Sequence, residues 1–186
     1  MMSKPRDSVP DRDQDFARVV AAHRNAILRY GLRRLDDRSA AEDLVAETFI
    51  VVWRRLGELP TRDEELLWLY AIAGRVLSNL KRSQQRSLRL EMRLSAEREA
   101  GNEAPRYSME DIEELMEALG SLSDSNRELI QLAYWEKLSY REMGVVLGCS
   151  EKAAGIRLSR ARQSLRERLN QSPTPIASLP LLQEEM

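Results

Sequence analysis

Apolar residues recur at spacings of three and four along most of this chain, the pattern of helices that bury one face. Three such runs fill the first half, and their apolar positions are Phe16, Val19, Val20, His23, Ile27 and Tyr30, then Val45, Thr48, Phe49, Val52, Trp53 and Leu56, then Leu66, Leu69, Tyr70, Ala73, Val76, Leu77 and Leu80. The second half continues the pattern at Ile112, Leu115, Met116 and Leu119 and at Leu129, Ile130, Leu132 and Ala133. No alternating strand pattern is present, so the sequence predicts an all-α protein.

Capping boxes indicate where the helices begin. A Ser or Thr followed three residues later by Glu can satisfy two backbone amides that the first helical turn leaves without partners. Four such pairs stand at the start of a predicted helix, and they are Ser39 with Glu42, Thr61 with Glu64, Ser125 with Glu128 and Ser139 with Glu142. We therefore expect helices to begin at these four positions.

The segment from Ser139 to Leu169 has the pattern of a helix-turn-helix. Its first helix is short and is predicted to end at Gly148, because helices commonly end at a residue that tolerates a left-handed backbone. Ser150 can then cap the second helix, whose inward stripe is Ala154, Leu158, Ala161, Leu165 and Leu169. Two helices joined by so short a turn must cross steeply.

Proline, glycine and asparagine interrupt the pattern and divide the chain into domains. A loose N-terminal end is expected over residues 1–12 and a disordered tail over residues 171–186, since both are polar and contain prolines. Residues 87–110 lose their apolar rhythm around Gly101 and Pro105 and are predicted to form a linker. Two small helical domains are therefore expected, over residues 13–86 and 111–170.

Charge is distributed unevenly, although the chain is nearly neutral with 29 basic and 30 acidic residues. Residues 75–93 contain six basic residues and one acid, and residues 152–168 contain the same numbers, so each segment has a net charge of plus five. Residues 94–136 contain three basic and eleven acidic residues, a net charge of minus eight. Two basic segments around an acidic stretch favour two nucleic-acid contacts, although ordinary charge segregation gives the same pattern.

The second helix of the predicted helix-turn-helix carries most of its cations outside the apolar stripe. These cations are Lys152, Arg157, Arg160, Arg162, Arg166 and Arg168. A solvated charged helix is the alternative interpretation. The capped first helix and the turn favour nucleic-acid binding instead, because Arg can both neutralise phosphates and read base edges.

The third predicted helix combines aromatic and basic residues, which together can hold an unpaired nucleic-acid strand. Trp68 and Tyr70 lie near its start, and the polar residues that follow include Arg75, Asn79, Lys81 and Arg82. Aromatic residues such as these two are, however, more often core residues than stacking platforms.

The sequence offers little for catalysis or for a metal or cofactor. Cys149 is the only cysteine and His23 the only histidine, so neither a disulfide nor a histidine pair can form within the chain. A metal on the carboxylates Glu42, Asp43 and Glu47 is conceivable, but a solvated acidic strip explains them better. We expect no enzyme activity, no membrane insertion and a cytoplasmic location, since neither a spanning run nor a signal-peptide pattern is present.

Three runs, in this order, resemble one protein family. They are AAEDLVAETFIVVWRRL, then WLYAIA followed by a basic helix end, then LSYREMGVVLGCS with RLSRAR. Residues 16–169 are therefore similar to bacterial RNA polymerase sigma factors of the extracytoplasmic-function group. In that family the first domain binds polymerase and melts the promoter, and the second binds the upstream promoter element.

The resemblance implies roles for residues of the first domain. Those implied to bind the clamp helices of the polymerase beta-prime subunit are Glu42, Asp43, Leu44, Glu47 and Phe49, and such an acidic strip beside apolar anchors suits a basic partner. Those implied to bind the single-stranded minus-ten element are Arg62, Trp68, Arg75, Asn79, Lys81 and Arg82. The loop from Gly57 to Asp63 would capture an unpaired base.

The resemblance also implies that the second domain reads the minus-thirty-five element in the major groove. The residues implied are Ser150, Lys152, Ala153, Ile156, Arg157, Ser159, Arg160 and Arg162. The chain departs from the family over residues 152–156, where the family often has Gly-Thr-Val-Lys-Ser. Gly155 and Ile156 replace polar residues expected to reach base edges, so base preference cannot be taken from relatives. Gly155 inside a helix also costs about 1 kcal/mol relative to Ala.

The leading hypothesis is a promoter-specificity subunit that reads promoter DNA at two elements. Its expected partner is core RNA polymerase, contacted at the beta-prime clamp helices and the beta subunit flap, and the family adds an anti-sigma factor as a further partner. The alternative is a stand-alone helix-turn-helix transcriptional regulator, which leaves the first domain unexplained.

Overall fold

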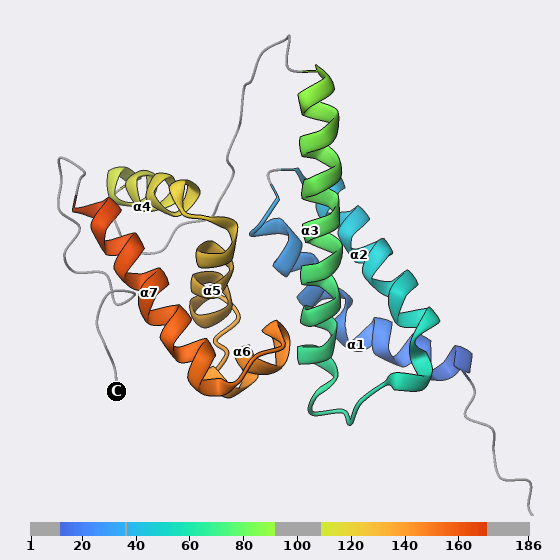
Figure 1. Cartoon of the computed structure of the whole chain (residues 1–186). Coiled ribbons are helices and arrows are strands. Elements are labelled where there is room, and N and C mark those ends of the chain that lie inside the picture. The colour runs from blue at the N-terminus through green and yellow to red at the C-terminus, as the bar shows by residue number, and fades with distance from the viewer. Residues whose placement is uncertain (1–11, 36, 92–108, 171–186) are drawn as a thin grey trace, which may run out of the picture. The chain divides into compact units, whose positions relative to one another are not determined.

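The computed structural model describes residues 12–35, 37–91 and 109–170, and within these ranges it contains helices and no strand. The all-α prediction is confirmed. The chain forms two compact units, Met1–Ala100 and Gly101–Met186 (Figure 1). No helix among the described residues has both the length and the apolar character needed to cross a membrane. The predictions for the N-terminal end, most of the linker and the C-terminal tail concern residues outside the described ranges.

The N-terminal unit packs three helices against one another. They are α1 (Arg12–Leu32), α2 (Arg38–Arg54) and α3 (Glu65–Glu91), with a short 3-10 helix, η1 (Leu56–Glu58), after α2. α3 continues past Arg86, where the first domain was predicted to end. The core is formed mainly by the predicted stripes, to which Ala41, Leu44 and Ile72 are added. Its buried apolar residues are Val19, Ile27, Tyr30, Ala41, Leu44, Val45, Phe49, Val52, Leu56, Leu69, Tyr70, Ile72, Ala73 and Leu77.

Three of the four predicted helix starts are wrong by a few residues. α2 is capped by Asp37, whose carboxylate accepts a hydrogen bond from the amide of Ala40 at 3.0 Å, so Ser39 lies inside the helix. α3 begins at Glu65 after a turn that follows Thr61. The cap of α5 (Asp124–Tyr134) is Ser123, not Ser125. Several residues able to cap stand close together at each start, and the sequence motif does not distinguish between them.

A buried carboxylate ties the start of α3 to α1. The side chain of Glu65 is 3% exposed and accepts hydrogen bonds from two guanidinium nitrogens of Arg18, at 2.8 and 3.0 Å. The Nε2 atom of His23 lies 3.0 Å from the same carboxylate. The His23 side chain is half-buried where the two helices meet. The hydrogen bond from Arg18 lowers the pKa of Glu65 although burial opposes the shift, and the same bond raises the pKa of Arg18.

The C-terminal unit is built around α7 (Glu151–Leu169), which contacts α4 (Met109–Ser121), α5 and α6 (Tyr140–Leu147) (Figure 1). All five residues of the predicted α7 stripe are buried, together with Ala118, Leu119, Leu122, Leu129, Ile130, Leu132 and Met143. Arg127 holds the end of α4, because its guanidinium donates to the carbonyls of Leu119 and Leu122, each at 2.9 Å. Met116, predicted on an apolar side, is 39% exposed.

The helix-turn-helix prediction is confirmed, including its caps. Ser139 and Glu142 form a reciprocal capping box, and the hydroxyl of Ser139 is the main cause of the lowered pKa of Glu142. Gly148 ends α6 in the left-handed conformation, with φ of 63°, and Ser150 caps α7. The turn also brings backbones together, since a Cβ added at Gly144 would lie 2.7 Å from the carbonyl oxygen of Cys149. Glycine is therefore required at position 144.

We predict that Glu65→Gln makes the N-terminal unit less stable near pH 7 by roughly 1–3 kcal/mol, the usual contribution of hydrogen bonds to a charged group. The pKa of Glu65 is lower in the folded state than in the unfolded state. Its contribution to the free energy of unfolding is therefore complete above the unfolded pKa of about 4.3, and it is lost as the pH falls through the folded pKa. Urea unfolding followed by tryptophan fluorescence from pH 7 to pH 3 should show the two proteins converging in stability. Glu58→Gln, at an exposed ion pair with Arg55, is the matched control and should change stability little.

Two glycine-to-alanine substitutions should have opposite effects on the C-terminal unit. Gly144→Ala should destabilise it by about 1–3 kcal/mol, because the new methyl group meets backbone that cannot move freely. Gly155→Ala should stabilise it by about 1 kcal/mol, since alanine favours the helix and the new Cβ would lie an unstrained 3.5 Å from Tyr140. Thermal unfolding measures both, and a lower midpoint for Gly155→Ala would contradict this packing.

Candidate functional site

The outer side of α7 presents residues that were predicted to enter the major groove. Each residue of an α-helix turns the side-chain direction by about 100°, so Lys152, Ile156 and Arg160 lie opposite the buried stripe. Exposed residues on or beside this side define the recognition face, which consists of Lys152, Ile156, Arg157, Ser159 and Arg160. Within the described part of the chain, no hydrogen bond or ion pair engages Arg157 or Arg160. Ser150 is exposed at the cap, and Ala153 is half-buried.

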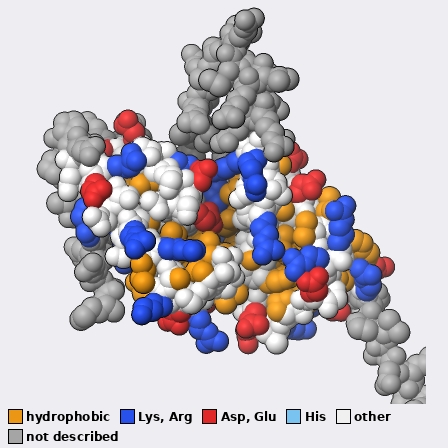
Figure 2. Space-filling model, in the orientation of Figure 1, with side chains coloured by type: hydrophobic (Ala, Val, Ile, Leu, Met, Phe, Trp, Pro, Cys, Tyr) orange, Lys and Arg blue, Asp and Glu red, His pale blue; other side chains and the backbone are white. Residues whose placement is uncertain are grey.

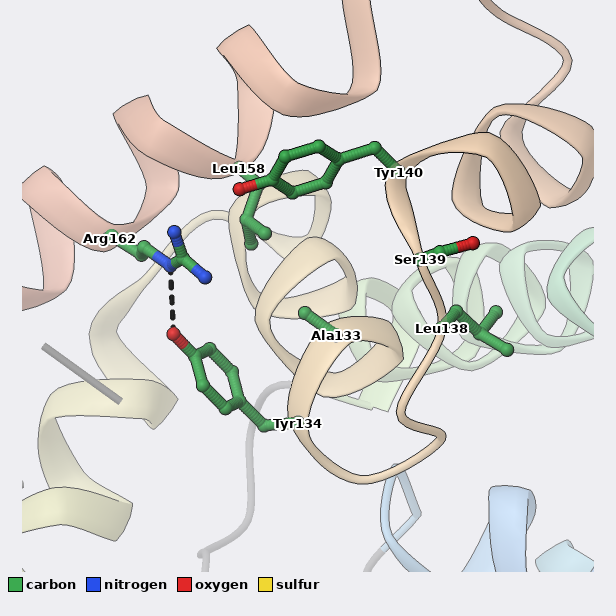
Figure 3. Close-up of a pocket in the computed structure, with 7 residues that line it drawn as sticks. All are labelled: Ala133, Tyr134, Leu138, Ser139, Tyr140, Leu158 and Arg162. Atoms are coloured by element: carbon green, nitrogen blue, oxygen red, sulfur yellow. Dashed lines mark hydrogen bonds between the residues drawn. The ribbon is translucent and has the colours of Figure 1, made fainter. Parts of the chain in front are cut away.

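Arg162, also predicted to contact DNA, turns toward α5 instead. It is half-buried, and its Nε donates a 2.8 Å hydrogen bond to the hydroxyl of Tyr134, as Figure 3 shows. Its guanidinium carbon lies 5.4 Å from the centre of the same ring. The position lies closer to the buried stripe than to the recognition face, so Arg162 stabilises the domain in this structure and is not free for a base.

A shallow pocket of about 310 Å³ lies beside this hydrogen bond. It is lined by Ala133, Tyr134, Leu138, Ser139, Tyr140, Leu158 and Arg162, which come from α5, the following loop, α6 and α7 (Figure 3). Gly155 packs toward the ring of Tyr140 within the same unit. The glycine in the unusual 152–156 segment therefore contacts α6 and leaves Ile156 as the segment's outward apolar residue.

One side of α3 gathers four of the residues predicted to bind the minus-ten element. Trp68, Arg75, Asn79 and Arg82 follow one another at helical spacing, and they define the strand face. Trp68 is half-buried and the other three are exposed. Arg82 lies along this face, because its guanidinium donates to the carbonyl of Ser78 at 3.1 Å and to the side chain of Asn79 at 3.2 Å. Arg62 is exposed in the turn before α3, while Lys81 is half-buried on a different side of the helix.

Trp68 is half-buried and has a cation beside its ring. The guanidinium carbon of Arg55 lies 5.6 Å from the ring centre, and Arg55 also donates a 3.1 Å hydrogen bond to Glu58. That hydrogen bond raises the pKa of Arg55 and lowers the pKa of Glu58. Tyr70, by contrast, is buried and stacks on Tyr30 with ring centres 5.4 Å apart. Of the two aromatic candidates, Trp68 is the more exposed to solvent.

On α2 the predicted polymerase-binding set divides between surface and core. Glu42, Asp43 and Glu47 are exposed, but Leu44 is 0% exposed and Phe49 only 6%. Both apolar residues lie on the buried stripe of the helix, so the structure places them in the core of the N-terminal unit and not on its surface.

The apolar surface of α2 is made by residues that the prediction missed. Ile50 is 42% exposed, and Trp53, predicted to be buried, is 39% exposed with Phe16 and Arg12 against its ring. Asp43, Glu47 and Ile50 lie opposite the stripe and define the docking face. The signal was available, because Ile50 falls three residues after Glu47, on the same side of the helix.

Figure 2 shows basic, acidic and apolar side chains mixed on the visible surface of each unit. Cations beside apolar side chains suit nucleic acid, whose phosphates attract cations while its bases offer apolar and stacking surfaces. The acidic carboxylates of the docking face would instead repel phosphates, so this surface suits a basic protein partner.

Family models match both units. The model for sigma-70 region 2 matches residues 19–87, and the model for sigma-70 region 4 matches residues 112–165. The region 2 match accounts for the first unit, which a stand-alone regulator leaves unexplained. It covers most of α1, all of α2 and most of α3, and the region 4 match covers α6 and most of α7.

Curated relatives agree with these matches. The chain is 31% identical to the ECF RNA polymerase sigma factor SigK of Mycobacterium sp. (strain JLS) over 85% of this chain and 83% of the relative. It is 28% identical to the RNA polymerase sigma factor CarQ of Myxococcus xanthus over 95% and 99% of the two chains. It is also 27% identical to the probable RNA polymerase sigma factor RfaY of Xanthomonas campestris pv. campestris. That match covers 85% of this chain but only 41% of the length of RfaY.

Two solved structures have a similar fold. One is the sigma factor RpoE in complex with the anti-sigma factor NepR from Bartonella quintana, with a TM-score of 0.67, 25% identity, and coverage of 84% of this chain and 98% of that chain. The other is CnrH in complex with the cytosolic domain of CnrY, with a TM-score of 0.59, 26% identity, and coverage of 87% and 96%. The chain therefore belongs to the sigma-70 family and is an RNA polymerase sigma factor of the extracytoplasmic-function group.

Proposed function

We propose that this sigma factor directs initiation through the recognition face, the strand face and the docking face, each with a different partner. The observation that carries the proposal is the placement of their residues. Each face lies away from the buried stripe of its own helix, and each presents the chemistry that its partner requires. None of the three roles needs catalysis by this chain, and all would be performed where polymerase and chromosome meet, in the cytoplasm.

The recognition face of α7 would enter the major groove at the minus-thirty-five element. The second helix of a helix-turn-helix contacts bases mainly through its N-terminal residues, and the recognition face occupies the first half of α7. Arg157 and Arg160 have exposed guanidinium groups that can read guanine in a bidentate manner. Farther along the same side, Gln163 donates to Glu167 at 3.0 Å, a polar pair with no excess of positive charge.

The strand face of α3 would hold the melted strand of the minus-ten element. Trp68 offers a ring for a base to stack on, while Arg75 and Arg82 attract the phosphates on either side. Arg62, in the turn before the helix, would add a cation to the loop that captures an unpaired base. This arrangement fits single-stranded DNA better than duplex, because an exposed base is needed for stacking.

The docking face of α2 would bind core polymerase at the clamp helices of the beta-prime subunit. Asp43 and Glu47 can pair with basic side chains of the partner, and Ile50, one turn after Glu47, supplies apolar area. Glu42 is already paired with Arg38 at 3.1 Å on the surface, so it is a weaker candidate. The C-terminal unit would contact the flap of the beta subunit.

We also infer that an anti-sigma factor holds this chain inactive. The support is that the similar RpoE structure was solved in complex with the anti-sigma factor NepR. An inhibitor that covered the docking face would block polymerase binding directly.

The proposed function is tested by run-off transcription with purified core polymerase, the full chain and a library of genomic promoters. The chain should direct initiation from a subset of promoters, and Asp43→Arg should abolish it because the substitution reverses one of the two negative charges of the docking face. Polymerase affinity, measured with labelled sigma factor, should fall in parallel.

Glu117→Arg is the matched control, since it makes the same charge change at an exposed position of α4. It should leave both initiation and polymerase affinity near the original level. Duplex DNA binding by the chain without initiation at any promoter would contradict the proposal, and unchanged polymerase affinity in Asp43→Arg would contradict the docking face.

A second experiment separates base reading from general phosphate attraction. Arg157→Ala should weaken binding of the holoenzyme to its promoter by about 1–3 kcal/mol if the contact is bidentate to a base, and the loss should disappear when the upstream element is scrambled. Arg168→Ala removes the same charge from the last turn of α7. It should weaken binding to the original and to the scrambled promoter equally, and by less than Arg157→Ala weakens binding to the original promoter. Affinities are compared by filter binding at one fixed salt concentration, because phosphate contacts depend on salt. An equal loss on both promoters for Arg157→Ala would exclude a base contact.

A further inference from the structure

An isoleucine occupies the middle of the recognition face. Ile156 is 46% exposed and lies almost directly opposite the residues of α7 that fill the core. Lys152 lies one turn before it and Arg160 one turn after it, both exposed. An apolar side chain is therefore held between two cations, at the position of the helix that projects farthest from its own domain.

Nothing within the described part of the domain explains this side chain. The core of the C-terminal unit is complete without Ile156, and the pocket beside Tyr134 is lined by other residues. The neighbouring Gly155 packs toward Tyr140 and so fixes which side of the helix faces inward. A single exposed apolar residue on an ordinary surface needs no explanation, but this one occupies a surface made otherwise of cations and hydroxyls.

The major groove contains one apolar group, the 5-methyl of thymine. The other base edges offer hydrogen-bond donors and acceptors, which an isoleucine side chain cannot satisfy. We propose that Ile156 contacts the methyl group of a thymine in the upstream promoter element, with Lys152 and Arg160 on adjacent bases or phosphates. This inference rests on the proposed function, and it makes Ile156 a specificity-determining residue.

Half-buried Ala153, one turn before Ile156, adds to the apolar surface available to the methyl group. The departure from the family over residues 152–156 then has a chemical meaning. A polar residue at position 156 would form hydrogen bonds with a base edge, whereas isoleucine contacts a methyl group. A base that presents a polar edge to isoleucine would leave its donors and acceptors without partners, so such a base is disfavoured at this position.

The test uses the holoenzyme with the full chain. Binding is first selected from promoters with a randomised upstream element, and each thymine of the selected element is then replaced by deoxyuridine, which removes only the methyl group. At one thymine, affinity should fall about four-fold, the equivalent of one buried methyl group. Ile156→Ala should bind the thymine and deoxyuridine promoters equally.

Met116→Ala is the matched control, because Met116 is a similarly exposed apolar residue on α4. It should keep the preference for thymine over deoxyuridine, and circular dichroism should show that both variants retain their helices. Three results would each overturn the inference. The selected element contains no thymine, or deoxyuridine lowers affinity at no position, or Ile156→Ala keeps the preference for thymine over deoxyuridine.

The same measurements distinguish the possible failures. Initiation without any methyl dependence would contradict this inference and leave the proposed function standing, whereas a holoenzyme that starts no transcript would contradict both. If Ile156→Ala weakened assembly with polymerase while leaving the thymine preference intact, Ile156 would belong to a protein contact and the inference would be wrong.

Discussion

Each helix of this protein has a single apolar stripe with which to hold its domain together. In the N-terminal unit three such stripes meet around Tyr30 and Leu44, and in the C-terminal unit the stripe of α7 supplies the centre against which three shorter helices pack. Units this small have little apolar area to spare. The stripe must therefore be fully buried, and the opposite side of each helix is left for partners.

This constraint explains which parts of the fold could be predicted from the sequence. Helical periodicity is a local property, so the stripe of α7 was found residue for residue, and the turn between α6 and α7 was found from Ser139, Gly148 and Ser150. Most core positions of α1, α2 and α3 were also found, but Ala41, Leu44 and Ile72 were missed and Trp53 is exposed. The same reasoning should have excluded Leu44 and Phe49 from a surface. Family resemblance assigned them a role, but their places on the wheel of α2 assigned them to the core, and burial in the structure supports the latter.

The remaining features depend on polar contacts between residues far apart in the chain. Glu65 meets Arg18 across 47 positions, and Arg162 meets Tyr134 across 28. No pattern within one helix distinguishes a buried carboxylate or a half-buried guanidinium from one that faces water, because both occur at positions next to the stripe. The helix starts differ from the prediction because neighbouring residues such as Asp37 and Ser39 both have side chains that can cap a helix. The conformation of the preceding backbone decides which of them does so.

The ion pair at the start of α3 also constrains how this chain can change over evolutionary time. The side chain of Glu65 is 3% exposed, so loss of Arg18 would leave a buried carboxylate without its guanidinium partner. Loss of Glu65 has a smaller electrostatic cost, because the side chain of Arg18 is 31% exposed and also lies near Asp15. Lineages that keep an acid at position 65 should therefore also keep a cation at position 18.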